Sequence, residues 1–201
     1  MKMRSYTIIR NIARPFVKVF FRYKLENKEN VPESPFIICA NHLSLRDPVC
    51  LACSITPPTR YMCKAELEKT PVVSFFLRKL RVIFVNRQKA DLGSIRQCVE
   101  TVKAGYNVGI FPQGTRIREQ AKAEQAQDGV AMICSLTKAT VLPVALIYKS
   151  KKPRLFSRCR VVVGKPLPYE EYSAIRDRKE QAHYIFGKVC EIIDNDGNKN
   201  S

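Results

Sequence analysis

From residue 34 onward, short apolar runs alternate with amphipathic stretches of helical period, and this alternation constrains the fold more than any other feature of the sequence. The apolar runs predict buried strands at 36–40, 61–64, 82–85, 107–111, 140–148 and 160–163. The stretches between them predict helices at 48–55, 71–80, 91–104, 131–138 and 169–193, followed by a polar, mobile tail. Because strands alternate with helices, we expect an α/β fold with a mostly parallel central sheet flanked by helices.

The first 25 residues form a basic segment with seven Lys or Arg and no acidic residue. Four of the basic residues recur at intervals of four and so follow one side of a helix: Arg10, Arg14, Lys18 and Arg22. Apolar residues occupy another side of the same helix. Pro15 predicts a kink or the start of a second helix. We interpret residues 1–30 as an amphipathic segment that binds an anionic membrane surface, residues 31–194 as the α/β domain and residues 195–201 as a tail. The alternative is an ordinary surface helix that packs on the domain.

Charge and composition narrow the classes of partner and site. Lys and Arg exceed Asp and Glu by 17, so the chain attracts anions such as nucleic acid, anionic membranes, acidic proteins or phosphorylated substrates. No uncharged stretch reaches the roughly 18 apolar residues of a membrane-spanning helix. The eight cysteines lie mostly in apolar runs, which indicates buried packing rather than a disulfide framework. With only two histidines, we expect no metal site.

His42 directly follows the first predicted strand, where α/β proteins place active sites. Pro48 disfavours helical geometry at Asp47, so we expect Asp47 to be a helix N-cap and residues 42–47 to form a loop. Such a loop can fold His42 back onto Asp47, whose carboxylate would fix the imidazole tautomer. The alternative is a loop histidine beside a simple helix cap. Because the sequence has no Gly-x-Ser-x-Gly turn, we expect His42 to deprotonate a substrate hydroxyl directly.

Two further predicted strands end in groups that suit an anion. The turn after residue 111 contains Gly114, Thr115 and Arg116, which offer backbone, hydroxyl and guanidinium donors. Arg87 follows the predicted strand at 82–85. In a parallel sheet the carboxyl ends of the strands lie along one edge, so we expect these groups and His42 to converge on one crevice.

These segments resemble the motifs of the glycerolipid acyltransferases, most closely the 1-acylglycerol-3-phosphate acyltransferases. The NHxSxxD motif of that family is matched in full, and FPEGTR is matched except that Gln113 replaces the usual Glu. The second motif resembles residues 64–67 and the strand that leads to Arg87, and the fourth resembles residues 141–144. The four motifs occur in the family's order, and the resemblance covers about residues 35–147.

The resemblance implies transfer of an acyl group from acyl-CoA or an acyl carrier protein to the free hydroxyl of a lysophospholipid, without a bound cofactor. His42 would be the general base and Asp47 its orienting partner. A further set would bind the acceptor and its phosphate: Ser44, Lys64, Arg87, Gln113, Gly114, Thr115 and Arg116. Glutamine at position 113 can donate and accept hydrogen bonds but has no charge.

A lipid acceptor requires access to a bilayer, so we expect a peripheral or monotopic protein on the cytoplasmic face of a membrane. The alternatives are an acyltransferase with another lysolipid acceptor and a weakly active, lipid-binding homologue. A basic nucleic-acid-binding protein is less favoured, because the sequence contains no DNA- or RNA-binding motif; we therefore expect no nucleic acid among the partners.

Overall fold

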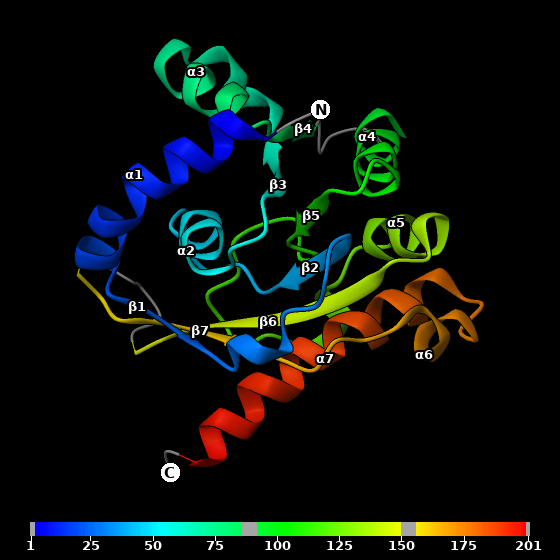
Figure 1. Ribbon diagram of the computed structural model, residues 1–201. Coiled ribbons are helices and arrows are strands. Elements are labelled where there is room, and N and C mark those ends of the chain that lie inside the picture. The colour runs from blue at the N-terminus through cyan, green and yellow to red at the C-terminus, as the bar shows by residue number, and fades with distance from the viewer. Residues whose placement is uncertain (1–2, 86–91, 150–155, 200–201) are drawn as a thin grey trace.

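The computed structural model describes residues 3–85, 92–149 and 156–199, and its centre is one twisted sheet (Figure 1). Seven strands stand in the order β1-β7-β6-β2-β5-β3-β4. Their bounds are β1 (Tyr23–Glu26), β2 (Phe36–Ala40), β3 (Thr59–Lys64), β4 (Ile83–Val85), β5 (Asn107–Ile110), β6 (Thr140–Tyr148) and β7 (Cys159–Val163). Of the described strand pairs, only β6 with β7 is antiparallel, which confirms the predicted mostly parallel sheet.

Helices cover both faces of the sheet, as expected (Figure 1). The described helices are α1 (Arg4–Phe21), α2 (Asp47–Ser54), α3 (Pro71–Lys79), α4 (Leu92–Lys103), α5 (Gly129–Thr137), α6 (Tyr169–Ser173) and α7 (Arg178–Lys199). Short 3-10 turns lie at η1 (Lys28–Asn30), η2 (Ala65–Lys69) and η3 (Ala123–Gln125). Strand β2 is buried on both faces: Phe36 and Ile38 pack with α1 and α2, whereas Ile37 packs with α4, α5 and α7.

The carboxyl ends of β2, β5, β3 and β4 lie along one edge of the sheet, because these four neighbours are parallel. Asn41 marks the end of β2. Its side-chain amide donates to the carbonyl of Leu146 and accepts from the N–H of the same residue, at 3.0 and 2.7 Å. This pair of bonds fixes where the chain leaves the sheet and enters the turn that contains His42.

Three predictions about secondary structure were wrong. Residues 23–26, which we assigned to the N-terminal segment, form β1 and pair with β7. The predicted helix at 169–193 is two helices, and the second continues to Lys199 through most of the predicted tail. Asp47 is the first residue of α2 rather than its N-cap, so its carboxylate is available for the preceding loop.

Helix α1 runs without interruption through Pro15 and presents two different faces. Its inner face buries Tyr6, Val17 and also Arg10, whose guanidinium group donates to the carbonyl of Thr56. The expected row of four exposed basic residues is therefore broken at Arg10. The outer face exposes a stripe of large apolar side chains: Ile8, Ile12, Phe16, Val19 and Phe20.

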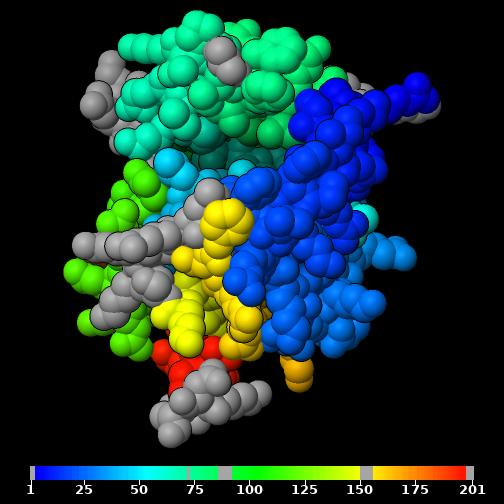
Figure 2. Space-filling model, turned by 90° about the vertical axis from the view of Figure 1, so that its left-hand side faces the viewer, coloured from blue at the N-terminus to red at the C-terminus, as the bar shows by residue number. Residues whose placement is uncertain are grey.

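Helix α3 lies beside the first turns of α1 on the same side of the molecule (Figures 1 and 2). The Ser5 hydroxyl donates to the carbonyl of Lys79 at 3.2 Å, which joins the two helices. Helix α3 also exposes apolar side chains, including Phe75 and Phe76 at 58% and 52%. The two helices therefore present apolar side chains to solvent on one side of the protein.

Candidate active site

His42 and Asp47 meet in the turn after β2. Nδ1 of His42 lies 2.8 Å from Oδ2 of Asp47, and the carboxylate is completely buried. Since an ionised carboxylate only accepts hydrogen bonds, Nδ1 is the donor of this pair, and Nε2 points away from Asp47. The imidazole is 11% exposed, so a small part of the ring reaches solvent.

The Asp47 carboxylate organises the turn as well as the imidazole. Oδ2 also accepts from the backbone N–H groups of Leu43 and Ser44, each at 2.7 Å. Oδ1 accepts from the hydroxyl of Tyr148 at 2.6 Å. Asp47 is the first residue of α2 and Pro48 the second, and no side chain caps this helix, so the Asp47 carboxylate serves the preceding turn. The five-residue spacing brings the two groups together because residues 42–46 are not helical.

Residues of the turn after β5 form hydrogen bonds with the backbone of His42. Its N–H donates to Oε1 of Gln113 at 2.8 Å, and its carbonyl accepts from the N–H of Ile117 at 2.8 Å. The ring stacks on Phe111 with centroids 4.3 Å apart. The predicted convergence of the ends of β2 and β5 is therefore present at the level of direct contacts.

Gln113 is turned inward rather than toward solvent. It is buried, and its Nε2 donates to Oε1 of Gln125 at 2.7 Å. Gln125 in turn donates from Nε2 to the carbonyl of Gln120. The side-chain oxygen of Gln113 thus supports the backbone of His42, and an uncharged amide satisfies every partner in this chain of hydrogen bonds.

The turn after β5 presents donors to solvent. Gly114 has φ +66°, a left-handed conformation that side chains disfavour, and this turns the chain outward after Gln113. Thr115 and Arg116 are exposed and line an open hollow of about 440 Å³ with residues 117–119. A guanidinium and a hydroxyl at an open hollow suit a phosphate.

The other predicted substrate residues differ in position. Lys64 is exposed at the carboxyl end of β3, on the expected edge. Ser44 is half-buried, and its hydroxyl oxygen accepts from the N–H of Arg46 at 3.3 Å, so it stabilises the turn. Arg87 lies outside the described residues.

Two residues of the site were missed from the sequence. Tyr148 ends β6 and reaches Asp47 from 101 positions along the chain. Arg46 is buried, and its guanidinium donates to the carbonyls of Phe21 and Ser157 at 2.9 and 3.0 Å. The one sequence signal for Tyr148 was a polar-tipped aromatic at the carboxyl end of a buried strand.

A cysteine nucleophile is not favoured at this site. Cys50 of α2 lies one turn beyond Asp47, and a hydrogen bond with Cys159 together with burial raises the pKa of its thiol far above the ordinary range. Burial likewise raises the pKa of Cys39 on β2. Such thiols stay protonated, and a protonated thiol is a poor nucleophile.

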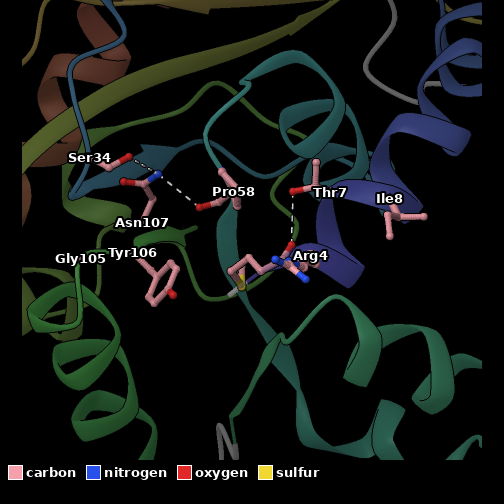
Figure 3. A pocket seen from close by; sticks show the side chains of 9 residues that line it. Arg4, Thr7, Ile8, Ser34, Pro58, Gly105, Tyr106 and Asn107 are labelled. Atoms are coloured by element: carbon pink, nitrogen blue, oxygen red, sulfur yellow. Dashed lines mark hydrogen bonds between the residues drawn. The ribbon is translucent and has the colours of Figure 1, made fainter. Parts of the chain in front are cut away.

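Two cavities differ in their relation to His42. An apolar cavity of about 150 Å³ reaches from Phe111 and Gly114 between β4, α4 and α5, with Met62, Ile95 and Ile133 among its walls. The second, of about 600 Å³, lies at the opposite edge of the sheet beside Asn107 (Figure 3). The Asn107 amide there donates to Ser34 and Pro58, so its hydrogens are engaged within the protein. Only the first cavity adjoins the candidate site.

Comparison with known proteins agrees with the motifs. The family model described as Acyltransferase matches residues 22–147. The chain belongs to the acyltransferase family. The 1-acyl-sn-glycerol-3-phosphate acyltransferase of Bacillus subtilis is 29% identical to this acyltransferase over 181 residues, which is 88% of this chain and 89% of that relative.

A second relative has a different name. The lyso-ornithine lipid O-acyltransferase of Pseudomonas aeruginosa is 30% identical over 120 residues, and the match covers 59% of this chain and 45% of that protein. Among solved structures, the 1-acyl-sn-glycerophosphate acyltransferase PlsC from Thermotoga maritima superposes with a TM-score of 0.71. That match covers 96% of this chain and 79% of PlsC at 23% identity, and it confirms the predicted fold.

Proposed function

We propose that this acyltransferase moves a fatty acyl group from a thioester to the free hydroxyl of 1-acylglycerol-3-phosphate, giving phosphatidic acid. The observation that supports this most directly is the hydrogen bond of 2.8 Å between His42 and Asp47 in the turn after β2. The name of the Bacillus subtilis relative supports the acceptor.

His42 would act as the general base. Nε2 takes the proton of the acceptor hydroxyl while the hydroxyl oxygen attacks the thioester carbonyl. The tetrahedral intermediate then collapses to an ester, and the imidazolium returns the proton to the leaving thiolate. Asp47 holds the ring and stabilises its positive charge. Proton, acyl group and thiol balance without an acyl-enzyme and without a bound cofactor.

The turn of Gly114, Thr115 and Arg116 would bind the acceptor phosphate, since it combines a guanidinium with hydroxyl and backbone donors beside an open hollow. The family resemblance adds Arg87 and Lys64 to the same role. The apolar cavity that begins at Phe111, the residue under the His42 ring, has walls suited to an acyl chain. The acyl donor is acyl-CoA or an acyl carrier protein.

Membrane association would come from α1 and α3. The outer stripe of α1 exposes Ile12 and Phe16 at 64% and 62%, and Arg14 and Lys18 lie beside it, one turn apart. This combination suits a helix that lies in the interface of an anionic bilayer. Among the described helices, none has both the length and the apolar character needed to cross a bilayer. We therefore propose a peripheral or monotopic enzyme.

A different lysolipid acceptor is the second candidate function, and the match to the lyso-ornithine lipid acyltransferase favours it. A merely lipid-binding homologue is less favoured. The oxygen of Gln113 accepts the His42 N–H without any need for charge, so the substitution leaves the turn intact.

The test is release of free thiol from acyl-CoA and from acyl carrier protein, measured with lysophosphatidate and a panel of other lysolipids. We expect the highest turnover with lysophosphatidate, and we expect His42→Ala to lower kcat by about 10²- to 10⁴-fold. His183→Ala, the other histidine, is the matched control and should retain activity. Wild-type turnover in folded His42→Ala would refute the base, and absence of turnover in the wild type would leave a lipid-binding protein.

A further inference from the structure

We propose that Tyr148 is a positioning residue for the catalytic pair, because its hydroxyl fixes the carboxylate of Asp47 from the side opposite His42. This inference rests on the proposed function, in which Asp47 orients and stabilises the imidazole. The hydroxyl of Tyr148 donates to Oδ1 of Asp47 at 2.6 Å.

The two carboxylate oxygens of Asp47 have separate tasks. Oδ2 takes three donors on the active-site side: Nδ1 of His42 and the N–H groups of Leu43 and Ser44. Oδ1 takes the phenol, the one donor to this oxygen found among the described residues. Because the residue is 0% exposed, bulk water cannot replace that donor. The phenol therefore sets the rotation of the carboxylate about its Cβ–Cγ bond.

Tyr148 is itself held in place. It ends β6 and is paired in register with Cys159 of β7. The guanidinium carbon of Arg46 lies 5.6 Å from the centre of its ring and 4.4 Å from that of Phe21. Arg46 is fixed in turn by bonds to the carbonyls of Phe21 and Ser157. The ring thus stands between a buried strand and a restrained cation, which limits its freedom to leave Asp47.

The phenol remains a donor across the working pH range. Burial and the negative charge of Asp47 raise the pKa of Tyr148 far above its usual value. Among the described residues, the titratable and charged groups that act on it are Asp47 and Cys50 of α2, Arg46 of the turn before α2 and Cys159 of β7. A protonated phenol next to a carboxylate donates its hydrogen and stabilises the ionised form.

This arrangement affects how strongly the Asp47 carboxylate attracts a positive charge on the His42 ring. A carboxylate that shares its charge with a phenol is a weaker partner for an imidazolium than one that does not. Loss of the phenolic hydroxyl should leave Oδ1 without a donor, make the carboxylate more basic and raise the pKa of His42. It should also loosen the carboxylate, so that fewer enzyme molecules have the ring correctly oriented.

The experiment compares Tyr148→Phe with the wild-type enzyme by NMR titration of the histidine rings and by steady-state kinetics. The chain has only two histidines, so His183 serves as an internal reference. We expect a raised His42 pKa, a kcat about tenfold lower and an unchanged KM for lysophosphatidate. The matched control is Tyr23→Phe, which removes another buried phenolic bond, to the carbonyl of Cys53; its His42 titration and kcat should equal those of the wild type.

A second variant, expected to shift the His42 pKa in the opposite direction, separates this effect from a folding defect. Fluorotyrosine at position 148 has a more acidic hydroxyl and keeps the ring, so it should lower the His42 pKa. Tyr148→Phe on an Asp47→Asn background should have little further effect, because the two residues act as a unit. The proposal would be overturned if His42 titrated as in the wild type in both Tyr148 variants, or if Tyr148→Phe changed the titration and kcat no more than Tyr23→Phe does. A rise in KM at constant kcat would overturn it as well. A shifted titration in a protein that transfers no acyl group would instead overturn the proposed function.

Discussion

Asp47→Asn removes a charge from the proposed catalytic pair of His42 and Asp47 and changes little else. Asp47 is completely buried and accepts four hydrogen bonds, three of them on Oδ2. The asparagine oxygen can take over these three donors, while its NH₂ faces the hydroxyl of Tyr148, which can rotate and accept. We therefore expect the turn to keep its shape and the variant to fold.

The magnitude follows from the distance between the pair. At 2.8 Å an imidazolium and a carboxylate attract each other by about 6 kcal/mol with an effective dielectric constant of about 20. Desolvation offsets much of this, and hydrogen bonds to charged groups have a net worth of about 1.5–3 kcal/mol. If the full net value is lost when His42 becomes protonated in the transition state, kcat falls by about 10- to 150-fold.

The assay is thiol release at saturating acyl donor and lysophosphatidate, with circular dichroism and thermal melting to check the fold. Asp128→Asn makes the same chemical change at an exposed position before α5 and should leave kcat unchanged. A folded Asp47→Asn protein with wild-type kcat would refute the argument, since it would mean that no positive charge develops on His42. A loss confined to KM would refute it as well.

Three further predictions concern the surface, the turn and the sheet edge. Replacing Ile12 and Phe16 by Gln should weaken binding to anionic vesicles, measured by sedimentation, at least tenfold, because each side chain can contribute about 1.5–3 kcal/mol when buried. The control is Leu136→Gln, which changes an exposed apolar residue on α5 and should have no effect. Equal binding by all variants would exclude the α1 stripe as the membrane-binding surface. Gln113→Met leaves the buried N–H of His42 without an acceptor and should lower kcat about tenfold. Gln113→Glu keeps that acceptor but loses the donor to Gln125, so it should retain more activity than Gln113→Met. A methionine variant with the kcat of the wild type would contradict this role. Hydrogen bonds from Arg160 and Lys24 lower the pKa of Glu26 from 4.5 to about 2. The folded state is therefore stabilised by this carboxylate above pH about 4.5 and loses that stabilisation as the pH falls toward 2. Urea unfolding should therefore depend more steeply on pH in that window for the wild type than for Glu26→Gln, and parallel curves would show that the ion pair contributes nothing.

The sheet was predictable because its central strands are buried on both faces. Strand β2 is five apolar residues with none exposed, and such a run has few alternatives in an α/β chain. Strand β1 was not predictable in this way. It has four residues of mixed polarity, and its partner Cys159 is 136 positions from Tyr23, so only tertiary pairing makes it a strand.

The helix break at residues 174–177 had a local signal that periodicity concealed. Asp177 caps α7 by accepting from the N–H of Glu180 at 2.8 Å, an acidic residue three positions after the cap. Gln181 closes the end of α6 by donating to the carbonyl of Tyr172. The apolar period continues across the break, so a pattern of hydrophobicity alone joins the two helices.

The candidate site shows the same division. His42 and Asp47 are five residues apart, and Pro48 indicated that the turn between them is not helical, so their contact followed from local sequence. Tyr148 and Arg46 act through contacts with residues about 100 and 25 positions away. Such contacts depend on how β6 and α1 are placed, which a single sequence does not encode locally.

The hydrogen bonds of Arg46 link the end of the N-terminal helix to the turn that contains His42 and Asp47. A protein shortened to begin after α1 would lose the carbonyl of Phe21, which is one of the acceptors of the buried Arg46 guanidinium beside Asp47 in sequence. Deletion would therefore confuse two quantities, attachment to lipid and turnover in free solution. Point substitutions on the outer face of α1 change lipid attachment alone and leave the bonds of Arg46 in place. Turnover of a water-dispersed acceptor by such variants then measures whether membrane binding changes the activity of the enzyme or only brings the enzyme to its substrate.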